Sequence, residues 1–286
     1  MTVIKRLGSG WMVIAALFFA IMGALVKIGA PYFSAMEMVF YRTILSVVVL
    51  GGVAVVTGKS LATPYIKAHL GRGVAGTMGI MLFFYALIHL PLATAVTLNY
   101  TSPIFLAILS FVILKERINR ATAAVLLLGF MGVIILLRPS IGGEQFVAGL
   151  VGLSAGAFAG WAYLQVRELA LLGEPEWRVV FYFSAVSAFI AGILAFVDGW
   201  HMPQNGQQVL ILLGIGVTAL IAQLSMTRAY KVGRKFVVAS FSYLTVVFST
   251  VLGVLWFAEV LHWQELVGIA IIIISGILGS VLPKKK

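Results

Sequence analysis

The sequence contains no cysteine, which excludes disulfide bonds and thiolate metal ligands. Histidine is also scarce, with four in 286 residues, so few side chains can bind a metal or exchange protons near neutral pH. Charged residues make up 10% of the chain, where soluble domains carry about 25%. In their place, 62% of the residues are hydrophobic and the mean hydropathy is +1.09. This balance predicts an integral membrane protein that has the lipid bilayer as a partner.

Signatures of enzymes are weak. The segment Gly52–Ser60 resembles a phosphate-binding loop, but five residues separate its two glycines where the motif has four. Glu259, His262 and Glu265 are spaced so that they could contact one metal ion, yet no HExxH pattern or second cluster supports a site. We therefore predict no catalytic residues, no metal and no cofactor, and a protein that is not an enzyme.

Ten apolar segments divide the chain. Each is long enough to cross about 30 Å of hydrocarbon as a helix, which takes about 20 residues. The loops between them are short and rich in turn formers and charges, so no extramembrane domain fits. We predict an all-α membrane protein with ten transmembrane helices, near residues 11–29, 35–56, 70–90, 93–114, 120–138, 147–166, 179–198, 207–229, 236–258 and 262–282.

The 20 lysines and arginines predict the orientation, because positively charged loops stay on the cytoplasmic side. With the N-terminus inside, ten spans place all of them except Lys27, Arg42 and Arg138 at the cytoplasmic side, Arg72 included. Both termini are therefore expected to be cytoplasmic. The basic clusters are short and lack interleaved aromatic residues, so the net charge of +11 does not indicate nucleic-acid binding.

A polar stretch within the fourth apolar segment recurs 143 residues later in the ninth. The matching residues are Thr97 with Ser240, Asn99 with Ser242, Tyr100 with Tyr243, and Ser102 with Thr245. Earlier in each half the matching offset is 139, which a short insertion between spans explains. Two repeats, residues 1–140 and 141–286, would then carry five spans each. Because five is odd, the second repeat is expected to insert upside down relative to the first.

Polar side chains inside a span are unfavourable unless they pair, face water or bind a ligand, and inverted-repeat transporters bind substrate between their halves. On an uninterrupted helix, Thr97 and Tyr100 share one face while Asn99 lies nearly opposite. We favour the Thr97 and Tyr100 face for substrate binding. Its counterpart is Ser240 with Tyr243. Asn99 stays a candidate, and the alternative is that these groups only bond across helices.

Four further candidates for substrate binding lie in other spans: Tyr85, Trp161, Tyr163 and Gln223. Aromatic residues in spans also serve as core or lipid-facing residues, and that alternative stays open for each of them. Trp161 and Tyr163 follow three glycines at four-residue spacing, a pattern typical of close helix packing.

Arg42 is the clearest ionisable residue within a span, and such residues are functional candidates. It could attract an anionic group of a substrate. Pairing with Glu37, or extension of the side chain to the membrane interface, is the role that we favour. If protons drive transport, Glu37, His89 and Asp198 are the titratable groups available.

Two sequence blocks carry a resemblance to a known family. Pro91 to Pro103 reads PLATAVTLNYTSP, and Leu114 to Arg117, LKER, closes the fourth segment. With ten spans in two inverted repeats, the chain resembles the bacterial EamA family of the drug/metabolite transporter superfamily over its whole length. In the second half the corresponding end, Phe257 to Glu259, matches less well.

The resemblance implies a secondary transporter of the bacterial inner membrane that exports a small organic metabolite, such as an amino acid or a related compound. Its central cavity would lie between the repeats. A proton or another ion is the candidate coupling ion, and no oligomer is required. An uptake carrier for a metabolite or vitamin-like compound is the first alternative. An integral-membrane enzyme and a structural membrane protein are the others.

Overall fold

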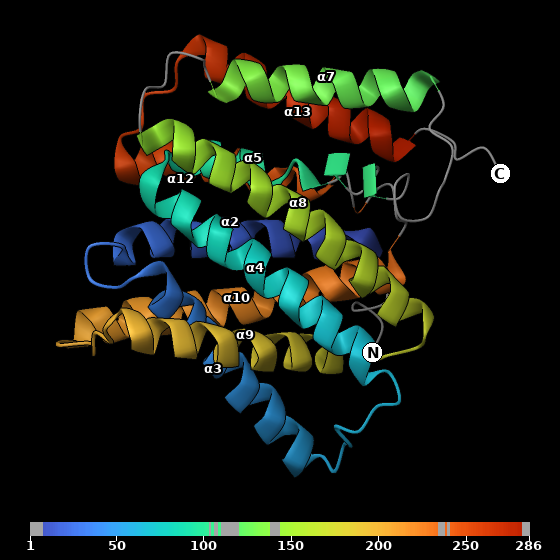
Figure 1. The fold of residues 1–286 in the computed structure, drawn as a ribbon, viewed down its shortest axis with the longest axis vertical. Coiled ribbons are helices and arrows are strands. Elements are labelled where there is room, and N and C mark those ends of the chain that lie inside the picture. The colour runs from blue at the N-terminus through green and yellow to red at the C-terminus, as the bar shows by residue number, and fades with distance from the viewer. Residues whose placement is uncertain are drawn as a thin grey trace.

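The chain is built from helices. The computed structural model describes residues 8–102, 104, 105, 108, 109, 120–137, 144–233, 238 and 241–281. Within these ranges the regular structure is entirely helical, so the all-α prediction is confirmed there. The elements are η1 (Gly8–Gly10), α2 (Trp11–Gly29), α3 (Ala35–Val56), α4 (Ile66–His89), α5 (Leu92–Asn99), α7 (Arg120–Leu137), α8 (Glu144–Leu171), α9 (Glu176–Asp198), α10 (Gly206–Val232), α12 (Leu244–Phe257) and α13 (Trp263–Val281) (Figure 1).

Six helical segments of the described chain are long and apolar enough to cross a bilayer. They are Gly8–Gly29, Ala35–Val56, Ile66–His89, Gln145–Leu171, Glu176–Asp198 and Gly206–Val232. Large apolar side chains also face outward, among them Phe196 with 78% and Leu255 with 72% of its surface exposed. A soluble protein rarely leaves so much apolar surface in water, whereas lipid accommodates it. The protein is therefore a multi-pass membrane protein, and the count of ten spans stays a prediction.

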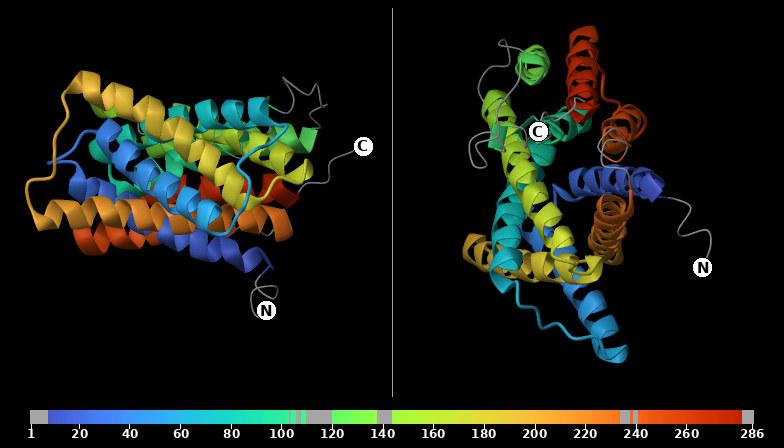
Figure 2. Two further views of the ribbon diagram at one scale, coloured as in Figure 1. Left: turned by 90° about the horizontal axis from the view of Figure 1, so that it is seen from below. Right: turned by 90° about the vertical axis from the view of Figure 1, so that its right-hand side faces the viewer.

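The main helix pairs each join a helix of the first half of the chain to a helix of the second half. α4 packs against α8, and α10 packs against α2 in the same way. Three further pairs, α3 with α9, α5 with α12 and α7 with α13, each join one helix to its counterpart in the other half. Figure 1 and the right-hand view of Figure 2 show α7 and α13 side by side at one end of the molecule. An internal two-fold relation between the halves would produce this pattern of contacts.

Two matching tyrosines interrupt helices. α5 ends at Asn99, and Tyr100 follows it in a turn. Tyr243 is likewise a turn residue, directly before α12. The expectation of continuous helices over residues 93–114 and 236–258 is therefore wrong at these two points. A helix break frees backbone groups from their usual bonds, so within a membrane it is tolerated where protein or a water-filled cavity surrounds it.

Candidate functional site

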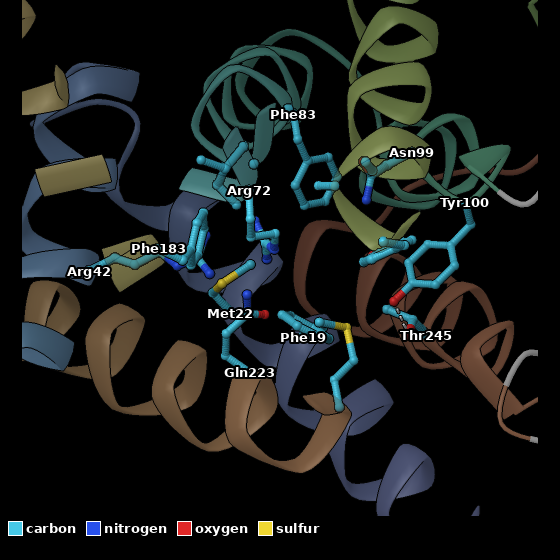
Figure 3. Close-up of a pocket in the computed structure, with 17 residues that line it drawn as sticks. Phe19, Met22, Arg42, Arg72, Phe83, Asn99, Tyr100, Phe183, Gln223 and Thr245 are labelled. Carbon is cyan, nitrogen blue, oxygen red and sulfur yellow. Dashed lines mark hydrogen bonds between the residues drawn. The ribbon is translucent and has the colours of Figure 1, made fainter. Parts of the chain in front are cut away.

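A cavity of about 70 Å³ lies in the middle of the helices, beside the end of α5 (Figure 3). Side chains from α2, α3, α4, α8, α9, α10 and α12 surround it together with the turn after α5. Its walls are formed by Phe19, Met22, Arg42, Arg72, Gly76, Gly79, Ile80, Phe83, Asn99, Tyr100, Ala159, Ala162, Tyr163, Phe183, Gln223, Met226 and Thr245. Most of these residues are apolar, and a few polar groups converge among them, as is typical of small-molecule sites.

The cavity brings together five of the ten candidates from the sequence: Arg42, Asn99, Tyr100, Tyr163 and Gln223. They come from four separate segments of the chain, so their spacing in the sequence could not reveal that they line one cavity.

Tyr100 points into the cavity because α5 ends just before it (Figure 3). Its hydroxyl accepts a hydrogen bond of 2.7 Å from Thr245 Oγ1, which joins the first half of the chain to the second. Thr245 is the counterpart of Ser102 in the repeat, and it was not among the candidates. The ring of Tyr243 lies beside Tyr100, with centroids 6.3 Å apart, but does not line the cavity.

Thr97 does not reach the cavity. Its hydroxyl donates to the Ala93 carbonyl at 2.6 Å, and its side chain is fully buried. The grouping of Thr97 with Tyr100 on one face assumed an uninterrupted helix, and the turn at Tyr100 removes that assumption. Asn99, the last residue of α5, lies on the face opposite Thr97 as expected and lines the cavity, and the turn after it places Tyr100 there as well. Ser240, the counterpart of Thr97, lies outside the described residues.

Two aromatic candidates lie away from the cavity. The ring of Tyr85 stacks on that of His89, with centroids 4.1 Å apart. Trp161 has 40% of its surface exposed and packs against Phe158, so it faces the outside of the helix bundle. Tyr163 lies about half a helical turn from Trp161 on α8 and therefore faces the opposite way, into the cavity.

Arg42 lines the cavity with only 3% of its surface exposed, so it does not extend to the membrane interface. The expected pairing with Glu37 does not form either. Glu37 instead accepts hydrogen bonds from the backbone N–H groups of Ser34 and His201, which cap α3 and hold the loop before α10. Both roles that the sequence favoured for Arg42 are thus corrected.

Arg72 is the cavity residue that the sequence misplaced. The sequence groups it with the cytoplasmic cations, because it lies at the very start of an apolar segment that begins at about residue 70. α4 begins earlier, at Ile66, so Arg72 falls in its second turn and is 3% exposed. Its guanidinium carbon lies 4.2 Å from the centre of the Phe183 ring, and that of Arg42 lies 6.0 Å from the same ring.

Ionic contacts close one end of the helix bundle near the end of α4. Lys27 Nζ lies 2.8 Å from Glu259 Oε1 and donates to the Leu90 carbonyl at 2.8 Å. The same carboxylate accepts from the Leu92 N–H at 2.8 Å. Glu259 thereby ties the second half of the chain to both α2 and the start of α5 in the first.

A second cluster lies near the beginning of α4, about 30 Å away along a helix of this length. Glu174, in the loop between α8 and α9, accepts from Thr63 Oγ1 at 2.9 Å. Its other oxygen lies 3.1 Å from His69 Nε2 and 3.2 Å from Arg178 Nη1. Burial raises the pKa of this carboxyl, but these three partners outweigh it and hold the pKa of Glu174 below its usual value.

Comparisons with known proteins agree on one family. The EamA-like transporter family matches residues 6–138 and 147–281. The pseudopaline exporter of Pseudomonas aeruginosa strain UCBPP-PA14 is 32% identical over 268 residues, which cover 94% of either chain. The riboflavin transporter of Vibrio cholerae is 30% identical, covering 94% of this chain and 91% of its own. One crystal structure, 20% identical, shares the fold with a TM-score of 0.68 over 94% of this chain and 95% of its own.

Proposed function

The chain belongs to the EamA-like transporter family, and from this premise we propose that it is a secondary transporter that exports a small organic metabolite, such as an amino acid or a related compound. The family and the relatives named above are transporters, in agreement with the expectation that the chain is not an enzyme. Export is the direction named for the relative from Pseudomonas aeruginosa.

The central cavity is the observation that carries the proposal. It is buried among helices of both halves, and Tyr100 from the first half meets Thr245 from the second at its wall. A transporter that works by alternating access needs such a site where its two repeats meet, so that either side can be opened in turn. An integral-membrane enzyme would need a cluster of catalytic groups, and a structural protein would need no polar cavity.

The two ionic clusters support alternating access. Lys27 with Glu259 closes one end of the molecule, and Glu174 with Thr63 and His69 closes the other. Each cluster joins one half of the chain to the other. We propose that rocking of the repeats opens one cluster while the other stays closed, so that the cavity faces one side of the membrane at a time.

The proposed topology has ten spans in two inverted repeats, residues 1–140 and 141–286, with both termini in the cytoplasm. The bacterial inner membrane is the proposed location. In this topology the cluster of Lys27 and Glu259 faces outward, and the cluster of Glu174 faces the cytoplasm, where the loops richest in lysine and arginine lie.

The test is a thermal-shift screen of the purified protein against amino acids, vitamins, nucleosides and sulfonium compounds, followed by counterflow of each hit in proteoliposomes. Tyr100→Ala is expected to lower counterflow at least about 10-fold, because it removes a wall of the cavity. Tyr85→Ala is the matched control, since it truncates a tyrosine outside the cavity, and it should exchange at the wild-type rate. Equal exchange rates in the wild type, Tyr100→Ala and Tyr85→Ala would show that the substrate does not pass through the cavity.

An uptake carrier is the second candidate, since the relative from Vibrio cholerae is named a riboflavin transporter. Net movement in everted membrane vesicles decides the direction. Accumulation of the hit inside everted vesicles is expected for an exporter, and accumulation in right-side-out vesicles would show uptake instead.

A further inference from the structure

Two positive charges line the cavity without a negative partner. Among the described residues, no carboxylate forms an ion pair with Arg42 or Arg72. Arg42 Nη1 and both Nε and Nη1 of Arg72 are buried and have no hydrogen-bond partner there. Two other partly buried cations are paired, Lys27 with Glu259 and Arg178 with Glu174.

An unpaired charge in an apolar interior is strongly unfavourable, and two like charges that share one cavity add their repulsion. Aromatic rings offset part of this, since both guanidinium groups lie against Phe183 and Arg42 also lies 5.8 Å from the Phe84 ring centre. A ring supplies about 2 kcal/mol or more to a desolvated cation, but it offers no hydrogen-bond acceptor in the plane of the guanidinium. Arg42 Nη1 and Arg72 Nε and Nη1 therefore have no acceptor among the described residues.

The backbone is shaped to bring Arg72 into this position. Gly76 lies one helical turn after Arg72, and a Cβ atom at Gly76 would collide with Arg72 Nη1 and would lie 2.8 Å from Phe183 Cε2. The absence of a side chain at Gly76 lets the guanidinium fold along α4 toward the cavity. Figure 3 shows Arg72 pointing toward the centre and Arg42 approaching Phe183 from α3.

The opposite wall is polar but uncharged. Asn99, Tyr100 and Thr245 lie there, across from the two arginines and Phe183 (Figure 3). The amide and hydroxyl groups can donate and accept hydrogen bonds but cannot neutralise a guanidinium. A ligand that satisfies both walls would carry negative charge at one end and neutral polar groups at the other.

We propose that the substrate is a small organic anion whose carboxylate or phosphate group is bound between Arg42 and Arg72, with its polar remainder against Asn99 and Tyr100. Arginine forms bidentate hydrogen bonds with both kinds of group, which is why either can complete the site. This inference rests on the proposed transport function and names the chemical class that the same cavity carries.

The first measurement is binding, by the rise in Tm of the purified protein at constant ionic strength. The probes are succinate and glutamate as carboxylates, glycerol 3-phosphate as a phosphate ester, xylitol as a neutral solute and putrescine as a cation. At least one anion is expected to raise the Tm, and xylitol and putrescine are not. The anion that gives the larger shift identifies which acidic group the site prefers.

The variants Arg42→Met and Arg72→Met keep an unbranched, flexible side chain and remove the guanidinium charge. Each is expected to weaken binding of the stabilising anion at least about 10-fold, because a buried charged hydrogen bond is lost. Without ligand, each should raise the Tm by about 3 °C, since one unpaired buried charge is relieved. If the arginines served only to pack against Phe183, both variants would lower the Tm instead.

Arg167→Met is the matched control, because Arg167 is an exposed arginine on α8 outside the cavity, and it should leave anion binding unchanged. Arg72→Lys, which keeps the charge, should retain more of the binding than Arg72→Met. The inference is overturned if no probe anion stabilises the wild-type protein, or if xylitol or putrescine stabilises it equally. It is also overturned if the Arg→Met variants bind the anion as the wild type does.

Counterflow separates this inference from the proposed function. Exchange of a neutral or cationic solute that depends on Tyr100 but not on Arg42 would support the proposed transport function. It would overturn the inference that the substrate is an anion. Binding of an anion that depends on both arginines, without exchange of any solute in proteoliposomes, would support the anion site and contradict the transport function.

Discussion

At the scale of single residues, the hydrogen bond between Thr245 and Tyr100 is the contact that joins the two halves at the cavity. Tyr100→Phe removes one partner and leaves the buried Thr245 hydroxyl unsatisfied, so we expect a loss of about 1–3 kcal/mol in the free energy of unfolding. Tm or denaturant titration of the purified protein measures it.

Tyr243→Phe is the matched control for Tyr100→Phe. The Tyr243 hydroxyl is buried without a hydrogen-bond partner among the described residues, so removing it should leave the stability unchanged or raise it slightly. Equal losses in the two variants would contradict the difference between the two tyrosines.

Glu174 predicts a pH dependence of stability. Its pKa is lower in the folded protein than in the unfolded chain, so its contribution is complete above the unfolded pKa of about 4.3 and is lost as the pH falls through the folded value. Glu174→Gln should therefore lower the Tm at pH 7, and the gap to the wild type should narrow below about pH 4.3. A gap that stays constant from pH 7 down to about pH 3 would show that the partners do not stabilise the charged carboxylate.

For Arg42 and Arg72, the sequence shows the charges but not their surroundings in the fold. Arg42 is identified because a charge within a long apolar run is visible in the sequence, but the sequence does not show that Glu37 fails to pair with it. The Glu37 carboxylate lies close to it in sequence, yet the capping of α3 and the loop at His201 occupy that group. Arg72 was misplaced because hydropathy marks where lipid contact begins, whereas α4 extends four residues further.

At the scale of secondary-structure elements, close packing of α8 against the end of α5 holds the turn at Tyr100. A Cβ at Gly156 would lie 2.5 Å from Thr101 Oγ1 and 2.7 Å from the Leu98 carbonyl oxygen. Gly156→Ala should therefore lower the free energy of unfolding by about 1–3 kcal/mol through overpacking, and it should weaken binding of the cavity's ligand.

Gly52→Ala, on α3, is the control for Gly156→Ala. A Cβ at Gly52 meets no atom within 4 Å, so alanine should be neutral or stabilise by up to about 1 kcal/mol through helix propensity. Thermal denaturation compares the two variants. A Gly156→Ala protein as stable as the wild type would mean that α8 and the turn at Tyr100 can move apart freely.

The helices themselves were largely predictable. A run of about 20 apolar residues is long enough to cross the bilayer, and within lipid its backbone groups must bond to one another, as a helix allows. Each of the ten expected segments contains most of a described helix, and α4, α8, α9 and α10 extend several residues beyond their apolar limits. The turns at Tyr100 and Tyr243 were not predictable from periodicity, because a helical wheel presumes that the helix continues. They depend on packing across the molecule, such as that of Gly156 against Leu98 and Thr101.

At the scale of the whole molecule, helices of the first half pack against helices of the second, and the cavity lies where the halves meet. One ionic cluster lies toward each end of the molecule. The repeat found in the sequence pointed to this arrangement. It could not reveal which side chains meet across the halves, since Lys27 with Glu259 and Glu174 with His69 are more than 100 residues apart.

Alternating access through the cavity is tested most directly by locking one end of the molecule. Because the chain has no cysteine, the Lys27→Cys, Glu259→Cys double variant carries the only two thiols and can be joined with a short bifunctional maleimide. Counterflow of the solute found in the screen is then measured in proteoliposomes before and after cross-linking, with each single cysteine variant as a control for modification alone. We predict that cross-linking stops exchange in the double variant and leaves the single variants unaffected. Exchange at an undiminished rate in the fully cross-linked protein would contradict the account.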